Sequence, residues 1–123
     1  MGSKEEFTCN ALTLEVVEED DSISVQWLGK SSDRDPGKFI TPILSSMLER
    51  GGNGTKRIVL DFQKLLYLNS STITPIIRLL DEARRGSHRI TVTYQKATKW
   101  QDLSFSALQI FKTKDERIQI LGL

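Results

Sequence analysis

The stretch that decides the fold is IVLDFQKLLYLNSSTITPIIRLL, which occupies residues 58–80. Its first three residues are continuously apolar and are closed by Asp61, which is typical of a central strand covered on both faces. Within residues 73–80, isoleucine and leucine recur at i, i+3, i+4 and i+7, the spacing of one face of a helix. The link that ends in Asn69 therefore leads from the end of a central strand into a helix.

Apolar and polar residues alternate twice before this stretch. The alternation over residues 12–16 and 23–27 predicts two strands, and the acidic residues 18–21 predict the turn of a hairpin between them. Residues 1–10 show no period. We therefore expect a flexible N-terminus over these ten residues and a single domain over residues 11–123.

A first helix is predicted between the hairpin and the central strand. Apolar residues follow helical spacing over residues 39–48, and the glycines within residues 51–54 end the helix. Asp35, which precedes a proline, is a suitable N-cap. Thr41, which precedes Pro42, offers a second and later start.

A third helix and two strands complete the chain. Alternation predicts strands at residues 90–94 and 118–120. Five residues between them recur as one face of a helix: Trp100, Leu103, Ala107, Ile110 and Phe111. The resulting order, ββαβαβαβ, predicts an α/β fold with a mixed sheet of four to five strands flanked by helices.

The composition is that of an ordinary folded domain. The chain has 123 residues, of which 38% are hydrophobic and 27% are charged. A net charge of +1 provides no broad positive field, so nucleic acid is not an expected partner. The apolar runs are shorter than the roughly 20 residues of a spanning helix or the roughly 7 of a signal peptide. We therefore expect a cytoplasmic protein without a membrane partner.

Metal and cofactor chemistry find little support in the sequence. Cys9 is the single cysteine, so neither an intramolecular disulfide nor a cysteine-cluster zinc site can form, and packing is its expected role. His88 is the only histidine and has no acid nearby in the sequence to orient it as a base. We expect no catalytic residues, no metal and no cofactor.

Hydroxyl side chains gather where the second helix begins. A helix N-terminus has unpaired N–H groups, so a phosphate attached to Ser70 or Ser71 would find donors there. These residues and Asn69 are also ordinary capping residues, which is the simpler interpretation on chemistry alone. Thr74, which precedes Pro75, offers a rival start for the helix.

Residues 58–61, the segment LYLNSS at 66–71 and the amphipathic helix that follows resemble the phosphosite segment of STAS domains, the family of anti-sigma-factor antagonists. In that family a strand and a short hydrophobic link lead to Asp-Ser-Ser-Gly at a helix start. The first serine is phosphorylated by a cognate anti-sigma kinase. The resemblance implies that Ser70 is the acceptor, with Ser71 as its rival.

Two residues depart from the commoner STAS pattern. Asn69 stands where that pattern has Asp, and Thr72 stands where it has Gly. The segment from Tyr67 to Ser71 is more similar to the SiaC-type regulatory phosphoproteins, a STAS-like bacterial group. In that group the hydroxyl residue after Asn is phosphorylated by a dedicated kinase, which again implies Ser70.

The resemblance implies a bacterial signal-transduction module that works by binding and partner switching and is not an enzyme. Its implied partners are a serine/threonine protein kinase of the anti-sigma type and a phosphatase. The residues implied to meet a partner are Tyr67, Asn69, Ser70, Ser71 and Thr72. The alternative is an unphosphorylated domain of the same fold that binds a small ligand near Asp61 and Asn69, or that binds a partner constitutively.

Three other features carry a structural interpretation beside a functional one. The glycine-rich run at 51–56 lacks the spacing of a phosphate-binding loop and leads from helix to strand, so a turn is predicted. The basic residues within 84–89 are those favoured at any helix C-terminus. Asp61 either ties down the following loop or serves a site at the sheet edge, and both interpretations stay open.

Overall fold

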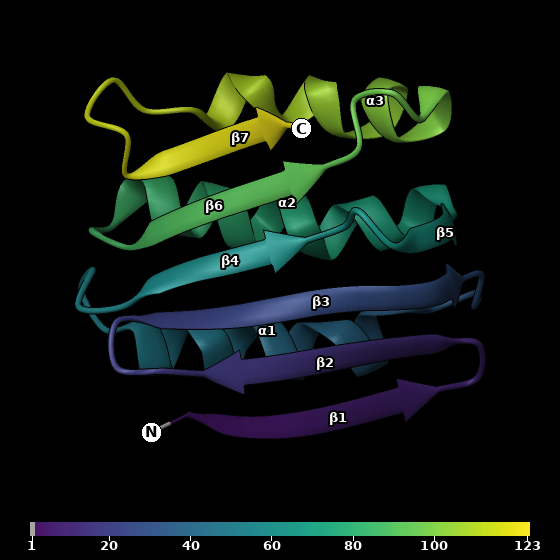
Figure 1. The fold of residues 1–123 in the computed structure, drawn as a ribbon, viewed down its shortest axis with the longest axis horizontal. Helices are drawn as coiled ribbons and strands as arrows, with labels where there is room; N and C mark the ends of the chain where they lie inside the picture. Colours follow the sequence, from purple (N-terminus) through teal and green to yellow (C-terminus); the bar gives the residue numbers. More distant parts are fainter. Residues whose placement is uncertain (1) are drawn as a thin grey trace.

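A computed structural model describes residues 2–123, and its seven strands form one mixed sheet (Figure 1). The strands are β1 (Ser3–Cys9), β2 (Leu12–Glu18), β3 (Ser22–Ser31), β4 (Arg57–Asp61), β5 (Leu65–Leu68), β6 (Arg89–Tyr94) and β7 (Ile118–Gly122). The helices are α1 (Gly37–Gly51), α2 (Ser70–Arg85), α3 (Lys99–Phe105) and the 3-10 helix η1 (Ser106–Phe111). The strand order is β1-β2-β3-β4-β6-β7, with β5 paired to β3. The first three strands pair antiparallel and the other pairs are parallel.

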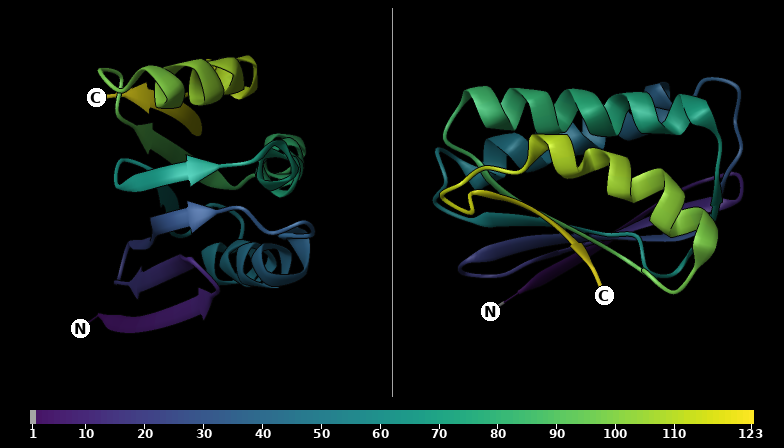
Figure 2. Two further views of the ribbon diagram at one scale, coloured as in Figure 1. Left: turned by 90° about the vertical axis from the view of Figure 1, so that its right-hand side faces the viewer. Right: turned by 90° about the horizontal axis from the view of Figure 1, so that it is seen from above.

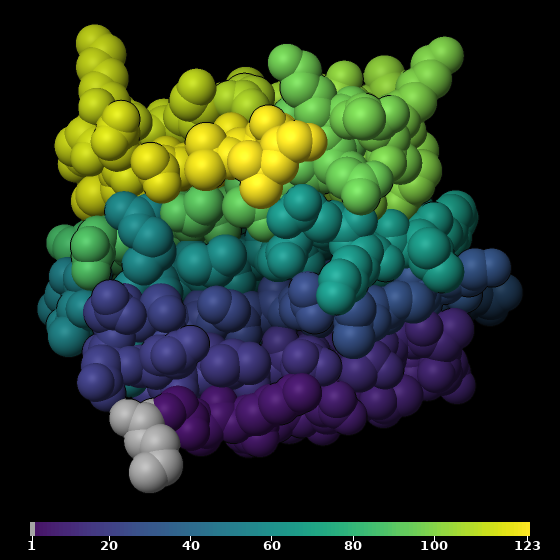
Figure 3. Space-filling model, in the orientation of Figure 1, coloured from purple at the N-terminus to yellow at the C-terminus, as the bar shows by residue number. Residues whose placement is uncertain are grey.

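The helices lie on one face of the sheet, and the hydrophobic core fills the space between them (Figure 2). Figure 3 shows the opposite face, which no helix covers. The central place of β4 between β3 and β6 is confirmed. The predicted cover on both faces is wrong, because Ile58 and Leu60 are fully buried while Val59, on the uncovered face, is only half-buried.

The N-terminal segment is a strand, which corrects the prediction of a flexible start. β1 pairs with β2 along its whole length, from Ser3 opposite Glu18 to Cys9 opposite Leu12. The segment has no apolar period because it is an exposed edge strand in which Phe7 packs against the core. Charged side chains along such an edge oppose pairing with other chains. Met1, which belonged to the same prediction, lies outside the described residues.

The strand β3 pairs with two parallel neighbours in succession. Residues 22–26 pair with β4, and residues 29–31 pair with β5, with a shift of register between Gly29 and Lys30. Gly29 has a φ of +86°, and a Cβ atom there would lie 2.1 Å from the carbonyl oxygen of Ala11. Only glycine fits this position. The end of β3 thus lies beside β5, a strand that was predicted only as a link.

Both long helices begin close to their predicted starts. α1 begins at Gly37 with Pro36 in the N-cap position and without a side-chain cap, so the predicted cap at Asp35 lies one residue too early. α2 begins at Ser70 and ends at Arg85. Each helix contains a proline as its sixth residue, which tightly packed helices can tolerate at a cost of about 3 kcal/mol. Two predicted later starts are therefore wrong, Thr41-Pro42 and Thr74-Pro75.

The third helix turns a different face to the core than predicted. Its buried residues are Gln101, Phe105, Leu108 and Phe111. The amide of Gln101 is buried because it donates to the carbonyl oxygens of Phe62 and Leu65. Because α3 continues directly into η1, the repeat changes from 3.6 to 3 residues per turn. Three residues of the predicted face are exposed instead: Leu103, Ala107 and Ile110.

Candidate functional site

Asn69 joins the end of β5 to the start of α2 and caps the helix. Its Oδ1 accepts hydrogen bonds from the backbone N–H of Thr72 at 3.1 Å and from the Thr72 hydroxyl at 2.8 Å. Its Nδ2 donates to the carbonyl oxygen of Asp33 at 2.8 Å, and its backbone N–H donates to the carbonyl oxygen of Ser31 at 3.0 Å. The amide side chain uses both its donor and its acceptor, which a carboxylate could not do. Asn69 thus fastens α2 to the end of β3.

Thr72 occupies the inside of this junction and is 0% exposed. Its Oγ1 lies 2.7 Å from the Oγ of Ser31. Because the single hydroxyl proton of Thr72 is directed at Asn69, Ser31 must be the donor in the second bond. Asn69 and Thr72, the two departures from the commoner STAS pattern, are therefore hydrogen-bonded to each other. Together with Ser31 they form one network, the Asn69–Thr72–Ser31 network. A buried Thr72 supports the site from within and cannot contact a partner directly.

Ser70 and Ser71 are both exposed at the start of α2, as predicted for an acceptor. Within residues 2–123 neither hydroxyl takes part in a hydrogen bond. Their backbone N–H groups are the first two of a 16-residue helix and have no acceptor within it. The positive end of the helix dipole favours negative charge here. A phosphate on either hydroxyl would meet free donors and a favourable field.

Two apolar side chains lie exposed on β5, the strand that leads to the serines. Leu66 is 64% exposed and Tyr67 is 47% exposed. Tyr67 lies opposite Lys30 of β3, and Lys64 is exposed just before β5. We call these four exposed residues the β5 surface; Leu66 and Tyr67, as neighbours in a strand, point to opposite sides of it. Exposed aromatic and aliphatic side chains of this kind are enriched where proteins bind one another.

The turn between β1 and β2 supports the junction through Asp33. The Nδ2 of Asn10 donates to the two carboxylate oxygens of Asp33 at 2.9 and 3.0 Å, and the Cys9 thiol donates to the same carboxylate at 3.5 Å. Burial, and then the adjacent Asp33 carboxylate, raise the pKa of the Cys9 thiol. The thiolate is therefore disfavoured, and the Cys9 thiol is held in its less reactive form.

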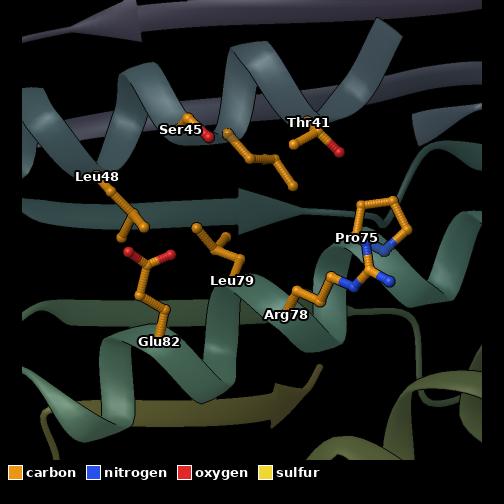
Figure 4. A pocket seen from close by; sticks show the side chains of 8 residues that line it. Thr41, Ser45, Leu48, Pro75, Arg78, Leu79 and Glu82 are labelled. Carbon is orange, nitrogen blue, oxygen red and sulfur yellow. The ribbon is translucent and has the colours of Figure 1, made fainter. Parts of the chain in front are cut away.

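Two of the hollows that border α1 and α2 reach Pro75 in the first turns of α2. The pocket between the helices holds about 50 Å³ (Figure 4), well below the roughly 300 Å³ at which ligand pockets begin. A second hollow of about 280 Å³ is open to the surface and has Ser71, Arg34 and Arg78 in its wall. Arg78 extends toward Pro75 near the start of α2 in Figure 4. Neither arginine forms an ion pair within the described part of the chain.

Asp61 ties down the loop that follows β4. Its Oδ1 accepts from the backbone N–H of Gln63 at 3.0 Å and from the Thr93 hydroxyl at 3.1 Å. Its Oδ2 accepts from Gln26 at 3.5 Å. Over residues 2–123 it shares no hydrogen-bond partner with Asn69. The geometry favours the structural interpretation of Asp61 over the predicted alternative of a ligand site built from Asp61 and Asn69.

The basic residues at the end of α2 are engaged with the fold. Arg84 donates to the carbonyl oxygen of Ile110 at 3.2 Å, and its guanidinium lies 5.3 Å from the centre of the Phe111 ring. Arg85 pairs with Asp81 at 2.8 Å. Arg89 donates to the carbonyl oxygen of Gly54 at 2.8 Å. The glycine-rich run forms the predicted turn, with positive φ at two of its glycines, Gly52 and Gly54.

Two further properties follow from the described residues. No helix between residues 2 and 123 is long and apolar enough to cross a membrane. In the same part of the chain, no three histidine, cysteine, aspartate or glutamate side chains are grouped to hold a metal ion.

Comparison with solved structures identifies the architecture. The fold matches an anti-sigma factor antagonist from Mycobacterium paratuberculosis with a TM-score of 0.62, 14% identity, and coverage of 89% of this chain and 93% of that chain. An uncharacterized protein from Shewanella loihica, described as having a SpoIIAA-like fold, matches with a TM-score of 0.52 and 15% identity, over 98% of this chain and 85% of that chain. This chain has a SpoIIAA-like fold. The STAS-like fold inferred from residues 58–71 is confirmed, while no family model and no curated protein matches the sequence.

The SpoIIAA-like fold brings together residues that sequence reasoning did not connect. Ser31 and Asp33 lie more than 35 residues before Asn69 in the sequence, yet both bind it directly. One feature of the sequence pointed to Ser31. It lies at an even spacing from the buried positions of β3, where an apolar residue is expected, but it is polar. A buried polar residue needs a partner, so its position pointed to a polar contact at the end of that strand.

Proposed function

We propose that this chain is a regulatory protein-binding module of the anti-sigma-factor antagonist type, controlled by phosphorylation of Ser70. The observation that carries the proposal is the exposed, unbonded hydroxyl of Ser70 on a helix start held rigid by Asn69 and Thr72. A kinase needs access to the hydroxyl. A helix start that is fixed in place also lets one added charge act on a defined surface. The kinase and phosphatase would supply the catalysis, so no enzymatic role is assigned to this chain.

The physical basis of the switch is charge. Phosphorylation adds about −1.5 to −2 charges and three acceptor oxygens. At Ser70 these would stand at the start of the helix that follows β5, whose exposed Leu66 and Tyr67 are the residues best suited to dock a partner. A partner that docks an apolar or acidic patch there would lose affinity, and one with an arginine pocket would gain it. Partner contacts are proposed for Tyr67, Asn69, Ser70 and Ser71.

Ser71 differs from Ser70 in its surroundings, which is why Ser70 is preferred as the switch. The hollow that contains Ser71 also contains Arg34 and Arg78, neither of them paired within residues 2–123. A phosphate on Ser71 would be partly neutralised by these arginines of its own chain. A phosphate on Ser70 would leave more of its charge available to a partner.

A second candidate function is constitutive binding without phosphorylation. It is favoured by the β5 surface, because Leu66 and Tyr67 are exposed whether or not Ser70 is modified. Apolar contacts of this size would bind a partner without help from a phosphate. In this case the serines would serve only as the first turn of α2.

Phosphopeptide mapping of protein purified from its native cells separates the two candidates. The proposal expects a fraction of the intact protein to carry one phosphate, mapped to Ser70. The Ser70→Ala variant should lose this phosphate and the matched Ser71→Ala variant should keep it. Absence of phosphate from the wild type under all growth conditions would favour constitutive binding.

A further inference from the structure

The three asparagines of the chain lie in different surroundings. Asn69 uses its side chain to cap α2 and to bind the Asp33 carbonyl oxygen. Asn10 donates to the Asp33 carboxylate at 2.9 and 3.0 Å. Asn53 is exposed in the turn between α1 and β4, and its side chain forms no hydrogen bond within residues 2–123. In the described chain, Asn53 is therefore the asparagine whose side-chain amide is not held in place.

The residue after Asn53 is a glycine, and the fold requires a glycine there. Gly54 has a φ of +90°, and a Cβ atom at this position would lie 2.6 Å from the carbonyl oxygen of Ser87. A side chain is therefore excluded. The other two asparagines precede Ala11 and Ser70, whose side chains hinder approach to their own backbone nitrogen. The backbone nitrogen that follows Asn53 has no such cover.

The backbone nitrogen of Gly54 is also without a hydrogen bond. Two hydrogen bonds close this turn, from the Gly52 N–H to the Glu49 carbonyl oxygen at 3.2 Å and from the Lys56 N–H to the Gly51 carbonyl oxygen at 3.1 Å. The N–H of Gly54 takes part in neither and has no other acceptor within residues 2–123. An unbonded nitrogen thus follows an unbonded amide directly in the chain. Attack of one on the other needs no second molecule to bind first.

We propose that Asn53 is a site of spontaneous covalent modification, at which the side-chain amide becomes a carboxylate. The Gly54 nitrogen loses its proton to a solvent base and bonds to Cγ of Asn53. The bond from Cγ to Nδ2 breaks, and ammonia leaves with a proton returned by the solvent. Water then opens the resulting succinimide ring at either of its carbonyls, which gives aspartate or isoaspartate. No oxidant or reductant is needed, and the inference is independent of the proposed phosphorylation.

The modification changes both charge and geometry just before the central strand. The new carboxylate adds one negative charge and so cancels the net charge of +1. Isoaspartate also adds a methylene group to the backbone of the turn. The contacts of the turn depend on its length, since the Gly54 carbonyl oxygen accepts from Arg89 at 2.8 Å and Lys56 pairs with Glu18 at 2.8 Å. The isoaspartate form should therefore melt at a lower temperature than the unmodified protein.

Storage of the purified protein at neutral pH and body temperature, followed by trypsin digestion and mass spectrometry, tests the inference. Trypsin releases residues 51–56 as one peptide, because Arg50 precedes them and Lys56 ends them. We expect this peptide to gain the mass difference between an amide and an acid. The gain should be faster in mildly alkaline buffer, because the attacking nitrogen must lose its proton. The peptides that contain Asn10 and Asn69 are internal controls and should keep their mass.

The Asn53→Gln variant is the matched control, because attack on its longer side chain would have to close a larger ring. This variant should keep the fold, as circular dichroism checks, and should lose both the mass change and the isoaspartate. An isoaspartate methyltransferase detects the latter by transfer of a labelled methyl group. An unchanged mass of residues 51–56 in the stored wild type would overturn the inference. Equal mass changes at Asn10 and Asn69, or an undiminished change in Asn53→Gln, would overturn it as well.

Discussion

The Thr72 hydroxyl donates a 2.8 Å hydrogen bond to the Oδ1 of Asn69, so the buried third residue of α2 and its cap residue hold each other in place. The same Oδ1 also accepts from the Thr72 backbone N–H. Ser70 and Ser71 lie between these two anchors. Their exposed hydroxyls therefore lie on a turn that hydrogen bonds fix on both sides.

Removal of the Asn69 side chain should destabilise the whole junction. Asn69→Ala removes the helix cap and the bond to the Asp33 carbonyl, and we expect a loss of about 2 kcal/mol in the free energy of unfolding. Asn69→Asp keeps the acceptor for Thr72 and should lose less. Urea unfolding followed by tryptophan fluorescence measures both. Ser71→Ala is the control, and equal stability of Asn69→Ala and this control would contradict the assigned cap.

The buried hydroxyl pair of Thr72 and Ser31 should behave as one unit. Thr72→Val leaves the Ser31 hydroxyl buried without its acceptor, so we expect a loss of about 1–3 kcal/mol. Adding Ser31→Ala should then cost less than it does in the wild type. A double-mutant cycle measures this coupling, and a coupling of zero would disprove the unit. Thr74→Val, at an exposed threonine of the same helix, should change stability little.

The sequence predicted the central strand and the second helix because the pattern that indicates each of them lies within a few consecutive residues. The three apolar residues before Asp61 and the helical spacing of residues 73–80 both stand in the chain itself. The strand β1 was missed because its charged side chains face solvent at a sheet edge. The strand β5 was missed because its four residues alternate poorly, with Leu66 and Tyr67 both exposed.

The sequence predicted where the candidate site lies, but it did not predict which residues hold the site together. Exposure of Ser70 follows from its position at a helix start, which the sequence shows. The roles of Ser31 and Asp33 depend on β3 pairing with β5, a contact between segments far apart in the sequence. The face of α3 was predicted wrongly because a buried glutamine, Gln101, satisfies backbone carbonyls that only the folded chain brings near.

Gly29 should be irreplaceable, in contrast to a glycine in an ordinary conformation. Gly29→Ala places a Cβ 2.1 Å from the Ala11 carbonyl oxygen at a φ of +86°, so we expect a loss above about 2 kcal/mol. Gly37→Ala, at the first residue of α1, meets only ordinary contacts beyond 3.4 Å and should be neutral or stabilising by up to about 1 kcal/mol. Thermal unfolding of both variants measures the contrast. Similar melting temperatures would show that β3 does not need the positive φ of Gly29.

Acid should weaken the fold partly through Glu18. The hydrogen bond from Lys56, together with the nearby Arg50, holds the pKa of this carboxyl below its ordinary value of 4.5. The stabilisation is present above pH 4.5 and is lost as the pH falls through the lower pKa of the folded state. Lys56→Gln should therefore lower stability at neutral pH and flatten its decline below pH 4.5. Lys114→Gln, which removes a lysine without an ion pair in the described chain, should leave the pH profile unchanged.

The central claim, a charge switch at Ser70, is tested most directly by partner affinity. A partner captured from native cells is titrated by calorimetry against the wild type, Ser70→Ala and Ser70→Asp, with Ser71→Asp as the matched control. The account predicts that Ser70→Asp binds with an affinity different from that of Ser70→Ala, by about tenfold, while the Ser71→Asp change is smaller. Identical affinities for the wild type, Ser70→Ala and Ser70→Asp would contradict the switch.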